Sequence, residues 1–540
     1  MFNGKEMLMI SSHEWRWTKG FSIFVIVFTL LPYIVGYARQ GEDWRYTGLL
    51  FGVEDGNSYI AKMRRGSVGD WLFRSPYTAE KQNGFLGFVP YLLLGKLVSP
   101  PGDHEQLVAV FHIFRSVSIY FLVNVVFRLI AYQIADVILR RLCLIVCVFG
   151  GGLGWSYLTG INNLWGGELP LEFYSPESFG FLAVIGIPHL VAARGFLLLS
   201  VLILISNPKE GWIKPGICIG LAWIGLGLMQ PLTVLIGWFV CFSFVMVLYI
   251  SKKINPQPIT EQHLRILIGR GVIGMAISSP IVIYTYLSFQ YDPYLIEWAK
   301  QNIIQSPPVW DYLLAYGVMF LFIFVVWRIL LFDPKPSTWL FLGWSLSFPI
   351  LAYFPYPLQR RLPESIWVAI VILAFYGIER LNLKKITAPV LLASISLIAP
   401  LFFFSASLSS VINPNLPLFR PKEEIELFQF LRDNIPQNQV VLANYDLSNT
   451  LPAWVSNFVL IGHGPESVHL ATVQRKVDLF LSGGYSLLEI KQLFSDYDIR
   501  LVILTSSEME KINNSHFPIN FLDRIYDNQK YNLFKVVQDH

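Results

Sequence analysis

Residues 20–37 read GFSIFVIVFTLLPYIVGY, a run that contains no charged side chain. A helix needs about 20 mostly apolar residues to cross the ~30 Å hydrocarbon core of a bilayer, and this run with its flanks has that length. The same bias extends through the 540-residue chain, of which 54% is hydrophobic and only 14% charged. Soluble proteins contain about 25% charged residues. We therefore predict that most of the chain lies within a membrane.

About eleven stretches of this kind are present, so the predicted fold class is mainly α, a polytopic transmembrane helical bundle. The predicted spans are residues 20–37, 106–130, 142–158, 181–205, 214–232, 233–250, 266–288, 312–332, 338–354, 364–380 and 387–406. Residues 85–98 are also apolar, but Gly87 and Pro90 interrupt them. They predict a re-entrant or interfacial segment rather than a full span.

Basic residues set the predicted orientation, because cytoplasmic loops carry an excess of Lys and Arg. The N-terminal segment contains Arg16 and Lys19, which predicts a cytoplasmic N-terminus. The other basic links then fall on the same side, and they include Arg140, Arg141, Lys209, Lys252, Arg265, Arg270, Lys335 and Arg380. An odd number of spans places the C-terminal end outside. The loops are not rich in glycosylation sites, which favours a bacterial plasma membrane.

The composition changes near residue 412, where charged residues return and apolar runs shorten. Residues 421–437, PKEEIELFQFLRDNIPQ, predict an amphipathic helix. Short β-branched runs predict strands at 440–443, 458–462 and 499–504, with helices at 467–481 and 486–496. Strand–helix alternation indicates a small α/β domain. We therefore predict a transmembrane domain over residues 1–411 and an extracytoplasmic α/β domain over residues 412–540.

Several chemistries are not indicated by the sequence. The four cysteines lie inside apolar runs, where they fit small hydrophobic side chains rather than disulfides or metal ligands. The sequence GGGLG at 150–154 lacks the lysine of a phosphate-binding loop, and no Cys/His set has zinc spacing. The net charge of +4 is small and says little about nucleic acid; no nucleic-acid partner is expected. An enzyme of this kind would take an activated substrate from the membrane.

The first external loop carries an acidic pair. It reads GVEDGNSYIAKMRRGSVGDWLFRSPYT from residue 52 to residue 78, with Glu54 and Asp55 side by side. A carboxylate held at the membrane surface can act as a general base. The alternative is that Asp55 caps the helix that the following residues predict. The membrane setting and the length of the loop favour the catalytic interpretation.

A basic pair, Arg360 and Arg361, stands within the loop YFPYPLQRRLPES at 353–365. The predicted topology places this loop outside, where basic residues are disfavoured. Two guanidinium groups suit a phosphate, because Arg presents paired N–H donors and never deprotonates. The alternatives are contacts with lipid headgroups or an ion pair with Glu364.

His189 and Arg194 occupy the external half of an apolar span, in the sequence GIPHLVAARG. A charged side chain there is costly and requires a partner or an anionic ligand. The preceding loop offers Glu168, Glu172 and Glu177 as partners or as a second acidic centre. A single histidine on an apolar face is more often a hydrogen-bonded core residue than a catalyst.

Together these features resemble the GT-C superfamily of membrane glycosyltransferases, and the resemblance covers nearly the whole chain. Its elements are many spans, an acidic motif in the first external loop and often a soluble C-terminal domain outside. The corresponding residues are Glu54 and Asp55 with Tyr59 for the acidic motif, and Gln359, Arg360 and Arg361 for the donor phosphate. The C-terminal runs PKEEIELFQFLRDNIPQNQVVLA and FVLIGHGPES look like the tail domain of bacterial members. His463 within the second run fits a catalytic role or a turn.

The resemblance implies hexosyl or pentosyl transfer from a polyprenyl-phosphate-linked sugar to a glycan, lipid or protein acceptor, with membrane lipids around the chain. Asp55 would deprotonate the acceptor hydroxyl, with Glu54 as the second choice. Tyr59, His189 and Arg194 would line the substrate cavity. A second external acidic motif is not identified, so a divalent metal ion is left open, and no other cofactor is implied.

Two other functions are compatible with the sequence: a transporter or flippase of a lipid-linked glycan, and a non-catalytic membrane scaffold. A transporter would explain the arginines within spans, but the sequence contains no evident inverted repeat of the kind common in transporters. An enzyme requires Asp55, Arg360 and Arg361 to face one external cavity, within about a sugar's length.

Overall fold

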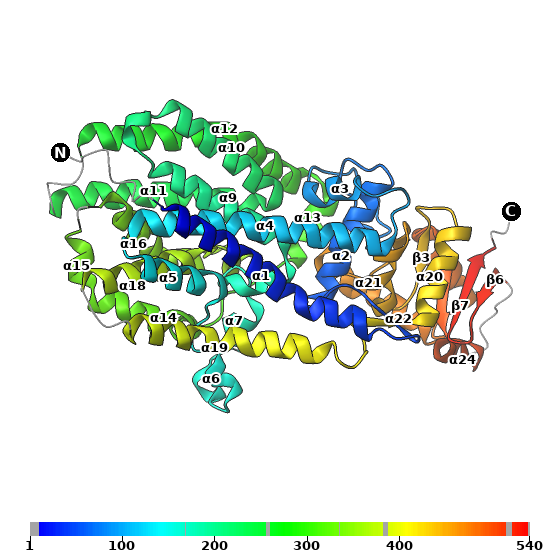
Figure 1. Ribbon diagram of the computed structural model, residues 1–540. Coiled ribbons are helices and arrows are strands. Elements are labelled where there is room, and N and C mark those ends of the chain that lie inside the picture. The colour runs from blue at the N-terminus through cyan, green and yellow to red at the C-terminus, as the bar shows by residue number, and fades with distance from the viewer. Residues whose placement is uncertain are drawn as a thin grey trace. The chain divides into compact units, whose positions relative to one another are not determined.

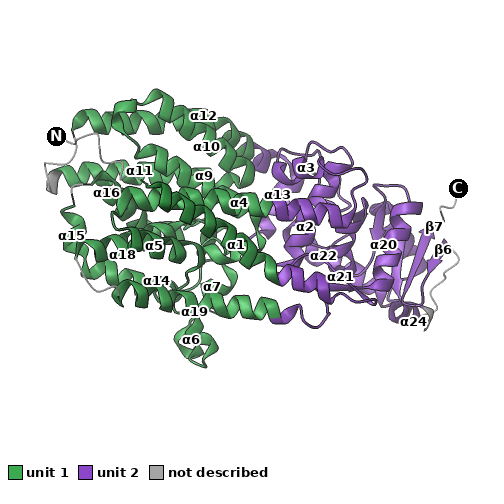
Figure 2. Cartoon of the chain, in the orientation of Figure 1, with its two compact units in different colours: residues 1–31, 114–286, 304–408 green, residues 32–113, 287–303, 409–540 purple. Residues whose placement is uncertain are grey.

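The computed structural model describes residues 10–167, 169–254, 260–333, 335–381, 387–514 and 521–537. The chain forms two compact units, each assembled from segments that are distant in the sequence (Figure 2). Unit 1 comprises residues 1–31, 114–286 and 304–408, and unit 2 comprises residues 32–113, 287–303 and 409–540. Unit 2 therefore combines the first predicted external loop with the C-terminal region. The division between residues 411 and 412 stays a prediction of domain organisation.

Five helices are long and apolar enough to cross a membrane by their length and composition. They are α1 (Ser12–Arg39), α4 (His104–Gln133), α11 (Pro231–Ile254), α12 (Glu261–Tyr291) and α19 (Thr387–Ser410) (Figure 1). Three shorter apolar helices are α9 (Pro188–Leu204), α10 (Ile213–Met229) and α14 (Val309–Val325). All of these coincide with predicted spans, which confirms a helical integral membrane protein. A total of eleven full spans is not confirmed.

Glycine breaks one of the other predicted spans. The segment 142–158 consists of α5 (Val137–Phe149), a glycine-rich turn and the short α6 (Trp155–Leu158). Glycine is about 1 kcal/mol less favourable than alanine within a helix. At Gly152 a Cβ atom would lie 1.7 Å from the carbonyl oxygen of Ala315, so the backbone approaches too closely for any side chain. This segment is therefore two helices rather than one.

Proline and short turns divide further predicted spans. Helix α9 begins at Pro188, because proline lacks the N–H that a helix interior requires, and α8 (Gly180–Gly186) precedes it. The remaining helices of this part are α15 (Trp327–Leu331), α16 (Pro336–Leu346), α17 (Phe348–Ala352) and α18 (Ile366–Arg380). Their apolar character was predicted. The breaks between α14 and α15 and between α16 and α17 were not, whereas α18 fills the predicted span 364–380 without a break.

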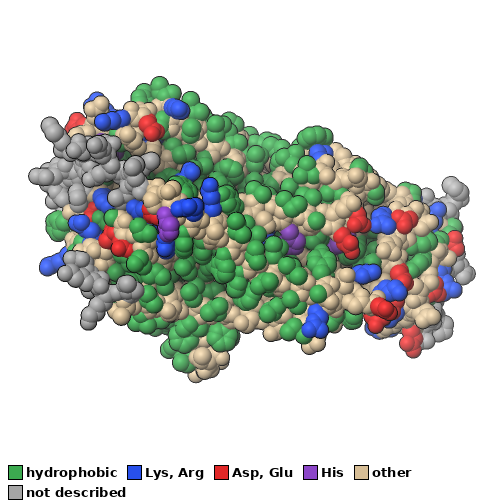
Figure 3. Space-filling view, viewed as in Figure 1, with side chains coloured by type: hydrophobic (Ala, Val, Ile, Leu, Met, Phe, Trp, Pro, Cys, Tyr) green, Lys and Arg blue, Asp and Glu red, His purple; other side chains and the backbone are tan. Residues whose placement is uncertain are grey.

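The outer surface of unit 1 is strongly apolar. On α14 the large side chains Leu321, Phe324 and Val325 are exposed, and Phe324 is 80% exposed. Figure 3 shows apolar side chains over most of the visible helical surface of this unit. Soluble proteins rarely expose apolar patches of this extent, so the surface fits lipid rather than water.

Several of the basic loops that connect the helices of unit 1 contact one another or neighbouring helix ends. Arg140 pairs with Glu14 at 2.6 Å, and Arg380 lies 3.6 Å from Asp333. Lys335 Nζ donates to a backbone carbonyl at the end of α4, 3.0 Å away. These contacts gather links that the sequence assigns to one side of the membrane. That this side is the cytoplasmic one stays a prediction.

Unit 2 contains a five-stranded sheet with the order β4-β3-β5-β7-β6. Its strands are β3 (Val440–Leu442), β4 (Phe458–Val459), β5 (Ile499–Thr505), β6 (Leu522–Asp527) and β7 (Tyr531–Val536). The three predicted strands are confirmed and pair in parallel, whereas β7 pairs antiparallel with β5 and β6. The hairpin of β6 and β7 was not predicted, because its strands carry polar side chains and do not form apolar runs.

Unit 2 also contains helices from each of its three sequence segments. They are α2 (Val53–Ser67), α3 (Val89–Gly95), α13 (Pro293–Gln301), α20 (Lys422–Asn434), α21 (Tyr445–Trp454), α22 (Leu470–Leu481), α23 (Leu487–Asp496) and α24 (Ser506–Asn514). The three predicted helices of the C-terminal region correspond to α20, α22 and α23. A short ladder joins the first loop to this region, since β1 (Trp44–Tyr46) pairs antiparallel with β2 (Phe419–Pro421).

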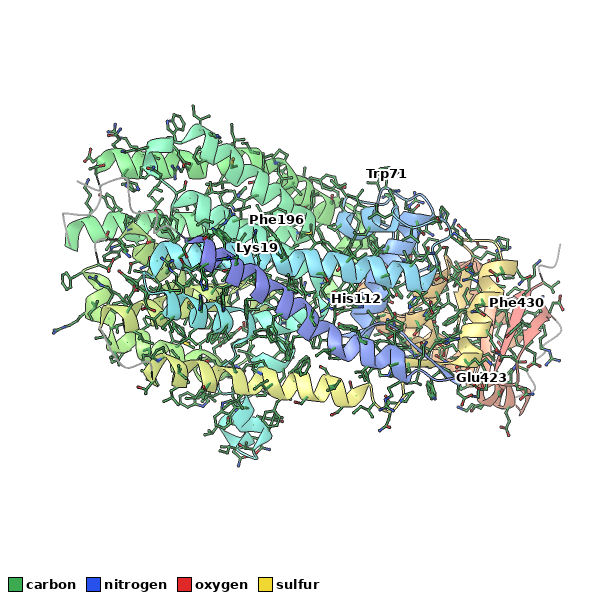
Figure 4. All side chains as sticks on the ribbon, viewed as in Figure 1. Lys19, Trp71, His112, Phe196, Glu423 and Phe430 are labelled. Atoms are coloured by element: carbon green, nitrogen blue, oxygen red, sulfur yellow. The ribbon has the colours of Figure 1, made fainter. Side chains whose placement is uncertain are left out.

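The segment predicted to be interfacial contains the short helix α3. Leu93 and Leu97 are exposed there. Trp71, labelled in Figure 4, lies on the surface of the same unit with Lys96 Nζ 4.1 Å from its ring centre. Exposed apolar groups beside Trp and Lys are typical of a membrane–water interface, so the interfacial interpretation of residues 85–98 stands as a prediction.

Helix α2 is fixed on both sides. Towards α3 the backbones touch: a Cβ atom at Gly66 would lie 2.0 Å from the carbonyl oxygen of Leu92. Towards α21, Asn57 donates to Asn449 at 2.7 Å, and Arg64 Nη2 donates to the carbonyl of Ala453 at 3.0 Å. These contacts set the position of the acidic pair at the start of α2.

Candidate active site

The acidic pair lies in the first turn of α2. The helix begins at Val53, and its N-cap residue is Gly52, whose φ of 57° is a left-handed conformation that glycine adopts without strain. Asp55 therefore lies inside the helix and does not cap it. A helix N-terminus carries partial positive charge and stabilises carboxylates in its first turn. The position suits both Glu54 and Asp55 as anions.

The C-terminal region holds Glu54 in place. The hydroxyl of Tyr445 donates to Glu54 Oε1 at 2.5 Å, and the backbone N–H of Gly464 donates to the same oxygen at 3.0 Å. Burial, together with the contact to Glu54, raises the pKa of Tyr445, so the phenol stays a donor. Asn449 also donates to the backbone carbonyl of Glu54 at 3.3 Å.

Asp55 begins a chain of ionisable groups that leads into the protein. His463 Nε2 lies 3.1 Å from Asp55 Oδ1, and His463 Nδ1 lies 3.5 Å from Glu466 Oε1. Lys62 Nζ then contacts Glu466 Oε1 at 2.5 Å. The Asp55 side chain is 60% exposed, whereas those of Lys62 and Glu466 are 1% and 3% exposed. We call these four residues the ionic relay.

Glu466 is well satisfied in the ionic relay. Besides Lys62 it accepts hydrogen bonds from the hydroxyls of Ser58 at 3.0 Å and Ser75 at 2.9 Å. Burial alone would raise the pKa of Glu466, but Lys62 and His463 outweigh it and lower that pKa below its usual value. Burial alone would lower the pKa of His463, but Glu466 and Asp55 outweigh it and raise that pKa. With His463 protonated, the two cations and two anions of the relay balance.

A cavity of about 460 Å³ lies beside the acidic pair within unit 2. Its lining residues are Leu50, Gly52, Val53, Glu54, Asn57, Ser410, Pro417, Leu418, Arg420, Tyr445, Asp446, Asn449 and Thr450. Both the first loop and the C-terminal region contribute to it. Small-molecule sites occupy about 300–1,000 Å³, so this cavity is large enough for a sugar.

The basic pair belongs to unit 1, in a 3-10 turn over Gln359–Arg361. The Arg360 guanidinium stands 4.6 Å from the ring centre of Tyr174, and its buried Nε has no hydrogen-bond partner among the described residues. Arg361 Nε likewise makes no hydrogen bond to the described residues, but it lies 3.3 Å from the carboxylate of Glu177, within ion-pair distance. Within the described chain Arg360 is therefore the less neutralised of the two.

Arg194 has a carboxylate partner. Its Nε donates to Glu364 at 2.8 Å, and both side chains are buried. Glu177 contributes only a backbone carbonyl, 3.2 Å from Arg194 Nη2, and Glu168 lies outside the described residues. Glu364 thus pairs with Arg194 and not with the basic pair that precedes it in the sequence.

The other predicted cavity residues are placed as follows. Tyr59 lies on α2, and its ring stacks on that of Tyr91 at a centroid distance of 4.9 Å. His189 is half-buried in the first turn of α9. A substrate-lining role for these residues and for Arg194 stays a prediction.

Two carboxylates of unit 1 serve glycine-rich turns. Glu172, in α7 (Leu171–Tyr174), accepts from the N–H groups of Gly152 at 3.0 Å and Gly154 at 2.7 Å. Burial raises the pKa of Glu172 to about 7. Asp311 similarly accepts from the N–H groups of the two glycines at 166–167, each at 2.7 Å. These bonds satisfy backbone donors that the helix breaks leave open.

The described residues contain no group of three or more His, Cys, Asp or Glu side chains placed to hold a metal ion.

No protein-family model and no curated protein matches this sequence. Solved structures do match. An oligosaccharyltransferase from Archaeoglobus fulgidus, in complex with Zn and sulfate, is 11% identical over 90% of this chain and 67% of its own, with a TM-score of 0.51. ArnT from Cupriavidus metallidurans is 14% identical over 95% and 97%, with a TM-score of 0.50. The arabinofuranosyltransferase AftD from Mycobacteria is 10% identical over 96% and 40%, also with a TM-score of 0.50.

The chain has the fold of GT-C glycosyltransferases. This confirms the fold that the resemblance implied. At such low identity the activity has to be argued from the site.

Proposed function

We propose that this chain transfers a sugar from a polyprenyl-phosphate donor to an acceptor hydroxyl at the external face of a bacterial plasma membrane. The observation that carries the proposal is the pair Glu54 and Asp55, held beside a cavity by side chains of the C-terminal region. Two structural neighbours are named as an oligosaccharyltransferase and an arabinofuranosyltransferase, which supports glycosyl transfer as the reaction.

In the proposed mechanism Asp55 accepts the proton of the acceptor hydroxyl. The acceptor oxygen then forms a bond to the anomeric carbon, and the bond from that carbon to the phosphate oxygen breaks. Polyprenyl phosphate leaves with the bonding electrons, and the anomeric carbon is inverted. His463 keeps Asp55 oriented and ionised, and Glu54 is the second candidate for the base.

In the same proposal Arg360 and Arg361 bind the donor phosphate and stabilise the negative charge that grows on it as it leaves. The ion pair of Arg361 with Glu177 supports Arg360 as the principal contact, because Glu177 already neutralises part of the charge of Arg361. Gln359 precedes the pair and is proposed to contribute a polar contact to the donor.

The proposal is tested with the purified full chain in lipid nanodiscs. The protein is incubated with a panel of polyprenyl-phosphate sugars, and the release of polyprenyl phosphate is measured. We expect release of polyprenyl phosphate from at least one of the donors, reproducibly in separate protein preparations. Folded protein that releases polyprenyl phosphate from none of the donors would contradict the proposal.

Replacing Arg360 should weaken donor binding more than replacing Arg361. A hydrogen bond to a charged group is worth about 1.5–3 kcal/mol, so Arg360→Ala should raise the apparent KM for the donor about 10- to 100-fold. Arg361→Ala should have a smaller effect, because Glu177 already occupies that guanidinium. Arg360→Lys keeps the charge but loses the paired donors, so its apparent KM for the donor should lie between those of wild type and Arg360→Ala. An unchanged KM in Arg360→Ala would remove the phosphate role.

Replacing His463 should change the pH dependence of transfer. Its pKa is raised, so the imidazolium that faces Asp55 persists to higher pH than usual. In His463→Gln this positive charge is gone, so the acidic limb of the kcat/KM profile should move to higher pH by about one unit. The matched control is His469→Asn, since His469 is exposed and Asn tolerates its φ of 55°. Superimposable acidic limbs for wild type and His463→Gln would contradict the role.

A further inference from the structure

We propose that the cavity of unit 2 binds the acceptor as an uncharged, hydroxyl-rich group, the chemistry of a glycan, and discriminates against phosphorylated or otherwise anionic groups. The inference rests on the proposed function, because it names the acceptor class of the same site. It stands on four cavity residues, Glu54, Asn57, Arg420 and Asp446, whose unused hydrogen-bonding groups are mainly acceptors.

Asn57 is the first of these acceptors. The residue is only 1% exposed, and its Oδ1 has no hydrogen-bond partner within the described chain. A buried polar atom without a partner costs free energy unless a ligand or water satisfies it. One of the two N–H groups of its Nδ2 is already used, since it donates to Asn449 at 2.7 Å. A ligand that satisfies Asn57 Oδ1 must therefore bring a donor.

Two carboxylates extend the same pattern. Both side-chain hydrogen bonds of Glu54 end on Oε1. Among the described residues Oε2 has no hydrogen-bond donor, so it is left to accept from a ligand. The Asp446 side chain is 59% exposed, although Arg420 anchors it. Carboxylates accept hydrogen bonds and have none to donate when ionised.

The donors around the cavity are largely used. Arg420 donates to Glu424 through Nε at 2.7 Å and Nη2 at 2.8 Å, and to Asp446 through Nη1 at 3.1 Å and Nη2 at 2.8 Å. Four of its five N–H groups are thus occupied. Asn449 Nδ2 donates to the carbonyl of Gly462 at 2.8 Å. No paired fork of N–H donors of the kind that binds phosphate is left on Arg420.

Charge and shape point the same way. Two carboxylates, Glu424 and Asp446, contact the one guanidinium of Arg420, and Glu54 lines the same cavity. Carboxylates therefore outnumber the cation there, and the local field disfavours an anion. Sugar hydroxyls are neutral and can donate to Glu54 and Asn57. The apolar part of the lining, which includes Leu50 and Leu418, suits the C–H face of a sugar ring.

The test measures saturation transfer from the full chain in detergent to two probe mixtures. One contains the methyl glycosides of glucose, galactose, mannose and N-acetylglucosamine, and the other contains their 6-phosphates. We expect binding of the neutral glycosides at least about tenfold tighter than of the phosphates. Asn57→Leu and Asp446→Asn should each weaken neutral binding about tenfold. Asp446→Asn keeps the side-chain shape and serves if Asn57→Leu does not fold.

The matched control is Asp498→Asn, a change on the surface of the same unit at a φ of 49° that Asn tolerates. It should bind the neutral mixture like wild type. Equal binding of both mixtures, binding of neither, or binding that ignores both cavity variants would overturn the inference. This binding measurement needs no turnover. Wild-type protein that binds glycosides but releases no polyprenyl phosphate would contradict the proposed function and leave the acceptor inference standing.

Discussion

The variant Asp55→Asn should lose about 10²- to 10⁴-fold in transfer rate, the usual contribution of a general base. Asn keeps the shape of the side chain and can still meet His463, but it cannot accept the acceptor proton. Donor binding should be almost unchanged, because the proposal assigns the phosphate to Arg360 and Arg361. The measurement is the release of polyprenyl phosphate under single-turnover conditions, with donor affinity determined separately.

Two companion variants make this result specific. Asp43→Asn makes the same chemical change at an exposed position of the first loop and should leave the rate unchanged. Glu54→Gln decides between the neighbouring carboxylates: a larger loss there than in Asp55→Asn would transfer the role of base to Glu54. Full activity in Asp55→Asn would remove its assignment.

The positions of the helices could be predicted because burial in lipid demands long apolar runs, and such runs are visible in the sequence. Their interruptions were harder to predict. The break within 142–158 depends on the approach of Gly152 to the backbone of Ala315, a contact between segments far apart in the chain. Similarly, β6 and β7 mix polar with apolar residues without regular alternation, and they are recognised only once β5 and β7 are paired.

The site divides in the same way. Glu54 and Asp55 could be singled out because an acidic pair in an external loop has no simple role in membrane insertion. Lys62 and Glu466 could not be, since nothing local to either residue indicates that they meet. The sequence allowed two interpretations of His463, a catalytic role or a turn. It did not indicate that His463 contacts Asp55, which the structure shows.

One consequence is that the C-terminal region helps to form the candidate active site, because it holds the acidic pair of the first loop in position. Tyr445 and the backbone of Gly464 fix Glu54, while His463 contacts Asp55. Substitutions in this region should therefore alter the acidic pair without touching it directly. The strongest case is the buried end of the ionic relay.

The variant Glu466→Gln should destabilise unit 2 by about 3–5 kcal/mol, the usual cost of leaving one partner of a buried ion pair uncompensated. Lys62 is 1% exposed and has Glu466 as its ion-pair partner at 2.5 Å. The measurement is thermal unfolding followed by intrinsic fluorescence. The control Glu426→Gln removes a carboxylate from a surface pair with Lys422 and should cost less than about 1 kcal/mol.

A double variant separates charge from packing. Adding Lys62→Met to Glu466→Gln removes the stranded cation, so part of the lost stability should return. The pH dependence has a defined sign as well: the pKa of Glu466 is lowered in the folded state, so its stabilising contribution is full above about pH 4.3 and is lost as the pH falls further. If Glu466→Gln unfolds at the same temperature as Glu426→Gln, the relay contributes nothing to stability. The charges of Lys62 and Glu466 would then have to act on Asp55 through His463 alone, and the acidic limb of the activity profile would be the property that Glu466→Gln changes.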